Sequence, residues 1–259
     1  MAGFRAYCDF TSGTNFISLK NGAGKLELSP EESRHLCGSL RAVKTDAVEA
    51  FDLDGNIFAC EISEASQKRA VLNILSKVER AKFDSQIYIA QCLPKSKAFE
   101  EIIRQSVEVG AAGIIPLLSE HTLVRFSDNI DAEKKLKKWR VHIIEAVKQS
   151  ANFSSFELPP PQGFKDFLAD SGKFDILIAA SLRQNSKPIL ETLSEASKHL
   201  IRPFKACILI GPEGDLTESE YDAAESAGFK PVTLGGNVMK CDTAALCALS
   251  CAVNFFMVK

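Results

Sequence analysis

The chain has 259 residues, 46% of them hydrophobic, and a formal net charge of −2 at pH 7. This length supports a full core and one or two domains, and the charge excludes a uniformly basic protein, so any nucleic-acid contact has to use a local patch. No run reaches the roughly 18 uninterrupted apolar residues of a membrane span, and no apolar signal segment follows a basic start. We therefore expect a cytoplasmic protein with no membrane association.

Residues 1–75 are predicted to form a small β-barrel domain. Ser29, Pro30 and Glu32 are typical of a helix start, and that helix is expected to run to about residue 40. Asp54-Gly55 between two alternating runs predicts a hairpin. The short apolar runs that predict strands lie at 4–7, 16–19, 24–28, 47–51, 56–62 and 70–75. Several short strands with one helix favour a barrel, because closure removes exposed strand edges.

Residues 76–259 are predicted to form an α/β domain, with the polar segment 76–84 as the boundary. Strands and helices alternate along this part of the chain, which indicates a parallel sheet covered on both faces. The expected strands are 87–90, 113–118, 174–180, 206–210 and 231–234, and the expected helices are 98–109, 132–150, 188–199, one from 218 to Gly228 and one from Asp242 or Thr243.

Two glycine-bearing loops follow the last two of these strands. Gly211-Pro212-Glu213-Gly214 follows 206–210, and Gly235-Gly236-Asn237 follows 231–234. If the two strands are parallel neighbours, the loops lie side by side at a crevice of the kind that binds ligands in α/β proteins. The first loop is not G-x-G-x-x-G, which disfavours a nicotinamide-dependent oxidoreductase, and the chain contains no Walker A motif. On spacing alone, a plain strand-to-helix turn remains the alternative.

Charged residues near these loops have two interpretations each. Lys240 and Asp242 are either a solvated lysine and a helix cap, or a fixed cation and its neighbour facing a substrate. The helix 132–150 carries five basic residues, which form either a solvated face or a phosphate-contacting face: Lys134, Lys135, Lys137, Lys138 and Arg140. The eight cysteines include no Cys-x-x-Cys pair and the four histidines are dispersed, so no metal site is predicted.

Taken together, these segments resemble the bacterial small-subunit ribosomal RNA uridine-N3 methyltransferases of the SPOUT superfamily over nearly the whole chain. The last three motifs are the most specific at their mutual spacing. The residues that carry the resemblance are His35-Leu36, Leu40-Arg41, Leu93-Pro94-Lys95, Lys97, 108–110, 116–120, Glu145-Ala146, Gln149-Ser150, 210–214, 227–229 with Pro231, and Leu234-Gly235 through Thr243-Ala244-Ala245.

The resemblance implies a PUA-like barrel over 1–75 and a SPOUT α/β domain over 76–259 with a carboxyl-terminal trefoil knot, one of the rare exceptions to unknotted chains. It also implies a homodimer that acts on small-subunit ribosomal RNA or the assembled subunit. The cofactor would be S-adenosylmethionine, held by Gly211, Pro212, Glu213, Gly214, Leu234, Gly235, Val238, Met239, Thr243 and Ala244. The implied catalytic residues are Lys240 and Asp242, and the RNA-binding residues are Arg41, Lys95, Lys97 and Lys240.

Some positions depart from the family's usual residues. Lys240 stands for an arginine and Asp242 for a glutamate; Asp215 stands for a glycine, His121 for an arginine and Gln105 for a lysine. A lysine keeps the charge of arginine but lacks its bidentate geometry. A non-catalytic RNA-binding protein that retains the fold is therefore the alternative function.

Overall fold

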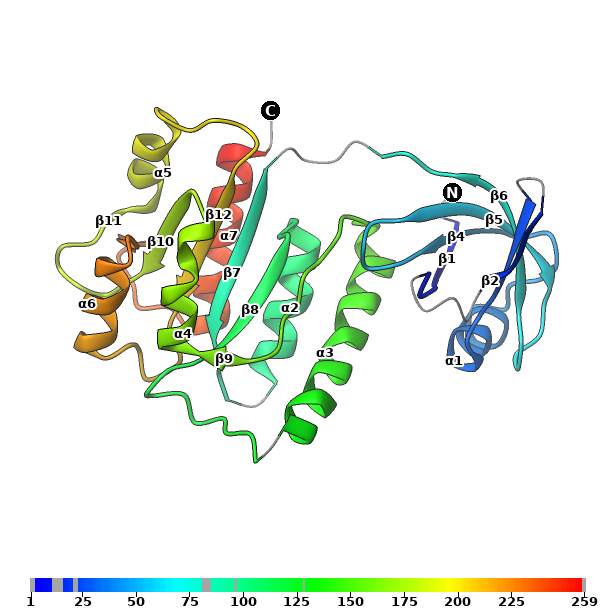
Figure 1. The fold of residues 1–259 in the computed structure, drawn as a ribbon, viewed down its shortest axis with the longest axis horizontal. Helices are drawn as coiled ribbons and strands as arrows, with labels where there is room; N and C mark the ends of the chain where they lie inside the picture. Colours follow the sequence, from blue (N-terminus) through cyan, green and yellow to red (C-terminus); the bar gives the residue numbers. More distant parts are fainter. Residues whose placement is uncertain are drawn as a thin grey trace. The chain divides into compact units, whose positions relative to one another are not determined.

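The computed structural model describes residues 3–10, 16–20, 23–80, 85–95, 97–127 and 129–257 (Figure 1). Contacts divide the chain into two units. Unit 1 comprises Met1–Lys82 with Phe153–Ser155, and unit 2 comprises Phe83–Asn152 and Phe156–Lys259. Within the polar segment that the sequence predicts as a boundary, residues 81–84 lie outside the described residues.

Unit 1 is built on one six-stranded sheet. Its strands are β1 (Phe4–Tyr7), β2 (Phe16–Lys20), β3 (Ala23–Glu27), β4 (Ala47–Phe51), β5 (Ile57–Glu64) and β6 (Val71–Lys77). They lie in the order β1-β4-β5-β6-β3-β2, with β1 parallel to β4 and the other pairs antiparallel. Among the described residues no pairing joins the edge strands β1 and β2, so the sheet is open and the predicted closed barrel is not confirmed.

Local sequence explains the turns of unit 1. The Ser29 hydroxyl accepts a hydrogen bond from the Glu32 amide and begins helix α1 (Pro30–Ser33). The chain continues without a break into the π-helical turn η1 (Arg34–Ser39), so helical structure reaches the expected end near residue 40, with π-helical rather than α-helical geometry in its second part. In the β4–β5 hairpin, Asp52 Oδ1 accepts from the amides of Asp54 and Asn56, while Gly55 adopts a φ of 86°.

Unit 2 contains a parallel sheet of seven strands. They are β7 (Gln86–Cys92), β8 (Gly113–Leu118), β9 (Gln162–Gly163), β10 (Ile176–Ala180), β11 (Lys187–Pro188), β12 (Lys205–Ile210) and β13 (Lys230–Thr233), in the order β11-β13-β10-β12-β7-β8-β9. The helices are α2 (Ala98–Val109), α3 (Asn129–Ser150), α4 (Phe164–Ala169), the 3₁₀ turn η2 (Ser171–Lys173), α5 (Ile189–Ser197), α6 (Glu218–Ser226) and α7 (Cys241–Phe256).

Helices cover both faces of this sheet, as the sequence predicts. On one face, Phe167 of α4 and Tyr221 of α6 pack in a buried cluster with alternate strand residues such as Cys207 and Leu209. On the other face, α7 contacts β7 and β12, and α2 contacts both α3 and α7 (Figure 1). In the described part of the chain, no helix is both long and apolar enough to cross a membrane.

The position of β10 differs from expectation. β10 pairs with β12 on one side and with β13 on the other, so the strands that precede the two glycine-bearing loops are not neighbours. The order of strands in a parallel sheet is set by long-range packing, which the local sequence pattern does not contain. Three strand ends, rather than two, therefore meet at this edge of the sheet.

Candidate functional site

A cavity of about 620 Å³ opens at the carboxyl ends of β12, β10 and β13. The predicted catalytic residues Lys240 and Asp242 both line it. The predicted cofactor-binding residues in its lining are Gly211, Pro212, Glu213, Leu234, Gly235, Val238, Met239 and Ala244. Gly214 and Thr243 do not belong to the lining. The structure thus brings most of the predicted site residues around one cavity, although β10 separates their strands.

The loop after β12 fits closely against its own side chains. A Cβ atom on Gly211 would lie 3.2 Å from Asp215 Oδ1 and 3.4 Å from the Leu216 amide nitrogen, so a larger residue would require the Asp215 side chain or the Leu216 backbone to shift. The side chain of Gln91, which is fully buried, donates from Nε2 to the carbonyl oxygens of Cys92 (2.8 Å) and Gly211 (3.3 Å). These hydrogen bonds attach the start of the first loop to the end of β7.

His121 braces the same loop from outside the cavity. Its Nδ1 lies 2.9 Å from the carbonyl oxygens of both Gly214 and Asp215. Because carbonyl oxygens only accept, Nδ1 carries the hydrogen, and these bonds raise the pKa of His121 above its ordinary value. A Cβ on Gly214 would lie 3.2 Å from the His121 Cβ, so Gly214 permits this close approach.

The predicted RNA-binding residues lie in different places. The Lys95 backbone amide donates to Glu213 Oε1 over 2.8 Å, which places Lys95 beside the cavity wall. Lys97 is the residue that precedes α2, and the next residue, Ala98, lines the cavity. Arg41 belongs to unit 1, where it is exposed and adopts a φ of 58° directly after η1 and Leu40.

Lys240 occupies the N-cap of α7, which begins at Cys241. The expectation that Asp242 or Thr243 caps this helix is therefore wrong: Asp242 lies in the first turn, and its Oδ1 accepts from the Thr243 amide over 2.8 Å. A carboxylate is favourable at a helix N-terminus, whereas a cation there is unfavourable. Helix stability thus explains Asp242 but does not explain Lys240.

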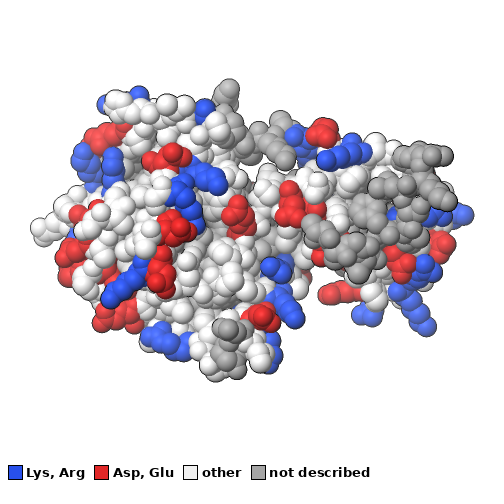
Figure 2. All heavy atoms as spheres, viewed as in Figure 1, with Lys and Arg blue, Asp and Glu red and all other residues white. Residues whose placement is uncertain are grey.

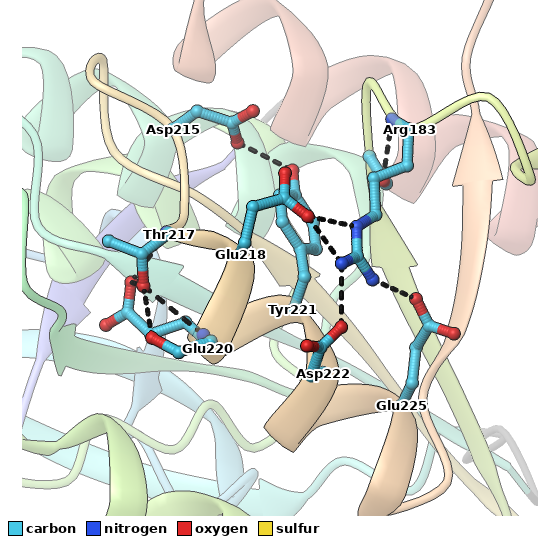
Figure 3. A network of polar contacts seen from close by, with 10 residues as sticks. Arg183, Asp215, Thr217, Glu218, Glu220, Tyr221, Asp222 and Glu225 are labelled. Carbon is cyan, nitrogen blue, oxygen red and sulfur yellow. Dashed lines mark hydrogen bonds and ion pairs between the residues drawn. The ribbon is translucent and has the colours of Figure 1, made fainter.

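Sequence reasoning missed one wall of the cavity. Ser181 and Leu182 follow β10 and line the cavity, as do Asp215 and Tyr221. Tyr221 is 3% exposed, and its hydroxyl donates to Asp215 Oδ1 over 2.6 Å (Figure 3). Burial raises the pKa of Tyr221, so it is a neutral donor. The rule that ligands bind at strand ends would have pointed to Ser181 and Leu182 had the place of β10 been known.

Helix α3 presents the predicted basic run at its surface. The side chains of Lys134, Lys135, Lys137 and Arg140 are exposed, while Lys138 pairs with Glu100 over 2.5 Å. Trp139 faces inward and packs edge-on against Phe99. All five of these basic side chains of α3 are therefore exposed to solvent, Lys138 included. Across the described residues of the whole chain, no cluster of three or more His, Cys, Asp or Glu could hold a metal ion.

The chain is similar to known RNA methyltransferases. A family model described as RNA methyltransferase domain matches residues 81–253. The ribosomal RNA small subunit methyltransferase E of Synechocystis is 29% identical over 86% of this chain and 71% of its own length. That of Mesomycoplasma hyopneumoniae is 30% identical over 64% of this chain and 68% of its own.

Solved structures agree. A methyltransferase from Legionella pneumophila in complex with S-adenosylmethionine is 26% identical, with a TM-score of 0.83 and 98% of each chain covered. The ribosomal RNA small subunit methyltransferase E of Neisseria gonorrhoeae, bound to S-adenosylmethionine, is 25% identical, with a TM-score of 0.78 and 97% of each chain covered. The chain therefore belongs to the RNA methyltransferase family that includes the ribosomal RNA small subunit methyltransferase E proteins.

Proposed function

We propose that this protein is an S-adenosylmethionine-dependent methyltransferase that methylates N3 of a uridine in small-subunit ribosomal RNA. The observation that carries the proposal is the cavity at the ends of β12, β10 and β13, whose lining contains both glycine-bearing loops. Structures that match nearly the whole chain hold S-adenosylmethionine.

The residues present fit such a cofactor. Gly211 lines the cavity, and the space beside it is taken by Asp215 and Leu216 of the same loop, so a glycine there keeps the loop close-packed. The lining combines apolar side chains such as Leu234 and Met239 with a few charged groups, which is typical of cofactor sites. The two loops would hold the cofactor between them.

The chemistry assigns separate roles to Lys240 and Asp242. The bound cofactor supplies a methyl group on a sulfonium. Uridine N3 is a poor nucleophile until its proton leaves, and the resulting negative charge spreads onto O2 and O4. Lys240, together with the amides at the start of α7, places positive charge at the cavity and would stabilise that anion. Asp242, which lines the same cavity, would accept the N3 proton.

Ribosomal RNA, free or in the assembled subunit, is the proposed partner. Figure 2 shows acidic and basic side chains interspersed on the visible face, so a local basic surface has to make the contact. In unit 2, the exposed basic residues of α3 and the loop of Lys95 are the proposed phosphate contacts. In unit 1, Arg41 has the same proposed role.

The finer architecture is also part of the proposal. We propose that residues 1–75 act as a PUA-like RNA-binding domain and that residues 76–259 form a SPOUT domain with a trefoil knot at the carboxyl-terminal end. We propose further that the protein is a cytoplasmic homodimer. Support for a dimer comes from α7, where Phe255 is 39% exposed and Leu246 and Cys247 are only partly buried.

Two measurements test the function against its alternative. The enzyme should bind S-adenosylmethionine in calorimetry and transfer a labelled methyl group to ribosomal RNA or to the small subunit. A non-catalytic RNA-binding protein would bind RNA without transferring methyl. Transfer of the methyl group to a position other than uridine N3 would contradict the proposed target but not the assignment of S-adenosylmethionine as the cofactor.

A further inference from the structure

Asp215 has a backbone conformation that its residue type does not favour. It lies in the loop between β12 and α6 with a φ of 61°, in the left-handed region that suits glycine. Its amide donates to the Pro212 carbonyl oxygen over 3.0 Å, which closes the turn. Glycine would make the same turn with less strain, so the backbone alone does not account for an aspartate.

The Asp215 side chain is held firmly on the cavity wall. Oδ1 accepts from the Tyr221 hydroxyl over 2.6 Å (Figure 3). It also accepts from the Leu216 amide over 2.8 Å. Among the described residues, Oδ2 has no protein partner, and Asp215 belongs to the cavity lining. One carboxylate oxygen is thus fixed by two hydrogen bonds, and the other accepts none from the described residues.

Tyr221 is itself locked by Arg183, which comes from the loop after β10. The Arg183 guanidinium lies 5.3 Å from the centroid of the Tyr221 ring. It also pairs with three carboxylates of α6, those of Glu218, Asp222 and Glu225 (Figure 3). Arg183 does not line the cavity, and its charge is matched by these partners. The residues that hold Asp215 in place, Tyr221 and Arg183, therefore add no positive charge to the cavity.

The charges of the cavity favour a cation near Asp215. The described lining contains three carboxylates, of Glu213, Asp215 and Asp242, and one ammonium, of Lys240. Glu213 is exposed, so water and salt screen it, and Asp242 lies two residues from Lys240. Asp215 is half-buried, and outside the cavity His121 bonds only to backbone carbonyl oxygens of its loop. Asp215 thus places a half-buried negative charge on the cavity wall, with no ion pair to it among the described residues.

We propose that Asp215 makes the site selective for the charged methyl donor over its neutral thioether product. The inference rests on the proposed use of S-adenosylmethionine. In the reaction the carbon–sulfur bond breaks, the methyl group bonds to uridine N3, the sulfur keeps the electron pair, and the N3 proton passes to the proposed acceptor Asp242. The ligand loses one positive charge while its amino and carboxylate groups are unchanged. A fixed carboxylate therefore attracts the donor more than S-adenosylhomocysteine, which favours product release.

Calorimetry with S-adenosylmethionine and S-adenosylhomocysteine on the full chain tests this. Asp215→Asn keeps an acceptor for Tyr221 and removes the charge, so it should weaken donor binding about three- to tenfold and change product binding less than about twofold. Asp215→Gly, which relieves the backbone, should lose the same selectivity. The control Asp170→Asn removes an exposed charge that is paired with Lys173 and does not belong to the lining, and it should change neither affinity.

The outcomes separate this inference from the proposed function. If Asp215→Asn weakens both ligands equally, or neither, the selectivity role is overturned while the cofactor assignment stands. If the unchanged protein binds neither ligand, the cofactor assignment and this inference fall together. The effect of Asp215→Asn on the ratio of the two ligand affinities should also become smaller as salt is raised from about 50 to 500 mM, because salt screens the charge of a half-buried carboxylate.

Discussion

The Lys95 amide donates a hydrogen bond to the Glu213 carboxylate over 2.8 Å, and this bond ties the loop after β7 to the first glycine-bearing loop. Glu213→Ala should weaken S-adenosylmethionine binding by about tenfold, because a charge-assisted bond that orders the wall is lost. Glu213→Gln keeps an acceptor and should retain most of the affinity. Calorimetry compares the two variants, and equal affinities in Glu213→Ala and the unchanged protein would contradict this role.

Lys240 should act on the chemical step rather than on cofactor binding. Lys240→Ala is expected to lower kcat by roughly 10²- to 10³-fold, since the anion of the base would lose its cation. Lys240→Arg keeps the charge and should recover part of the rate. Single-turnover methyl transfer, measured beside cofactor affinity, checks the assignment. Near-normal turnover in Lys240→Ala would show that the lysine is only a solvated helix-terminal residue.

The two glycine-bearing loops offer a matched steric test. A Cβ on Gly211 would meet Asp215 and Leu216 at 3.2–3.4 Å, whereas a Cβ on Gly236 meets nothing within 4 Å. Gly211→Ala should therefore reduce cofactor affinity at least about tenfold, through displacement of the loop. Gly236→Ala should bind normally. Comparable affinities in both variants would contradict the requirement for glycine at position 211.

His121 should make the first loop weakly sensitive to pH. Its folded-state pKa is raised above 6.5, chiefly by the bond to the Asp215 carbonyl oxygen, with Gly214, Glu120 and Glu220 adding to the effect. A raised pKa gives a stabilising contribution that is fully present below about pH 6.5 and is lost as pH rises through the folded value.

The measurement for His121 is its NMR titration, combined with thermal melts from pH 5.5 to 9. His121→Gln can donate through its amide without titrating, so the difference in Tm between the unchanged protein and this variant should shrink as pH rises. A His121 pKa at or below 6.5, or a Tm difference independent of pH, would contradict a stabilising role for the hydrogen bonds from His121 to the first loop.

Much of the fold follows from local sequence. The helix start at Thr217 was predictable because Thr217 and Glu220 are spaced for a capping box, and both of its hydrogen bonds are present. The parallel sheet followed from the alternation of strands and helices. The two-residue strands β9 and β11 and the short helix α4 were missed, because such elements exist through their packing on β8, β13 and neighbouring strands rather than through any periodicity.

The site was predictable only in part, for a related reason. The motif residues of both loops pointed to the lining, but Ser181 and Tyr221 were missed because strand order decides which ends meet. The start of α7 at Cys241 was also misjudged. Aspartate is a common N-cap residue, but the N-cap of α7 is Lys240, whose side chain makes no capping hydrogen bond.

The central claim is that this cavity holds S-adenosylmethionine so that Lys240 faces a uridine. The most direct test incubates the purified protein with isotope-labelled S-adenosylmethionine and small ribosomal subunits from cells that lack the gene, and then identifies the modified nucleoside by mass spectrometry. The account predicts label on 3-methyluridine in small-subunit RNA, present with the unchanged protein and strongly reduced with Lys240→Ala. Label on another nucleoside, or none at all with a protein that binds the subunit, would contradict it.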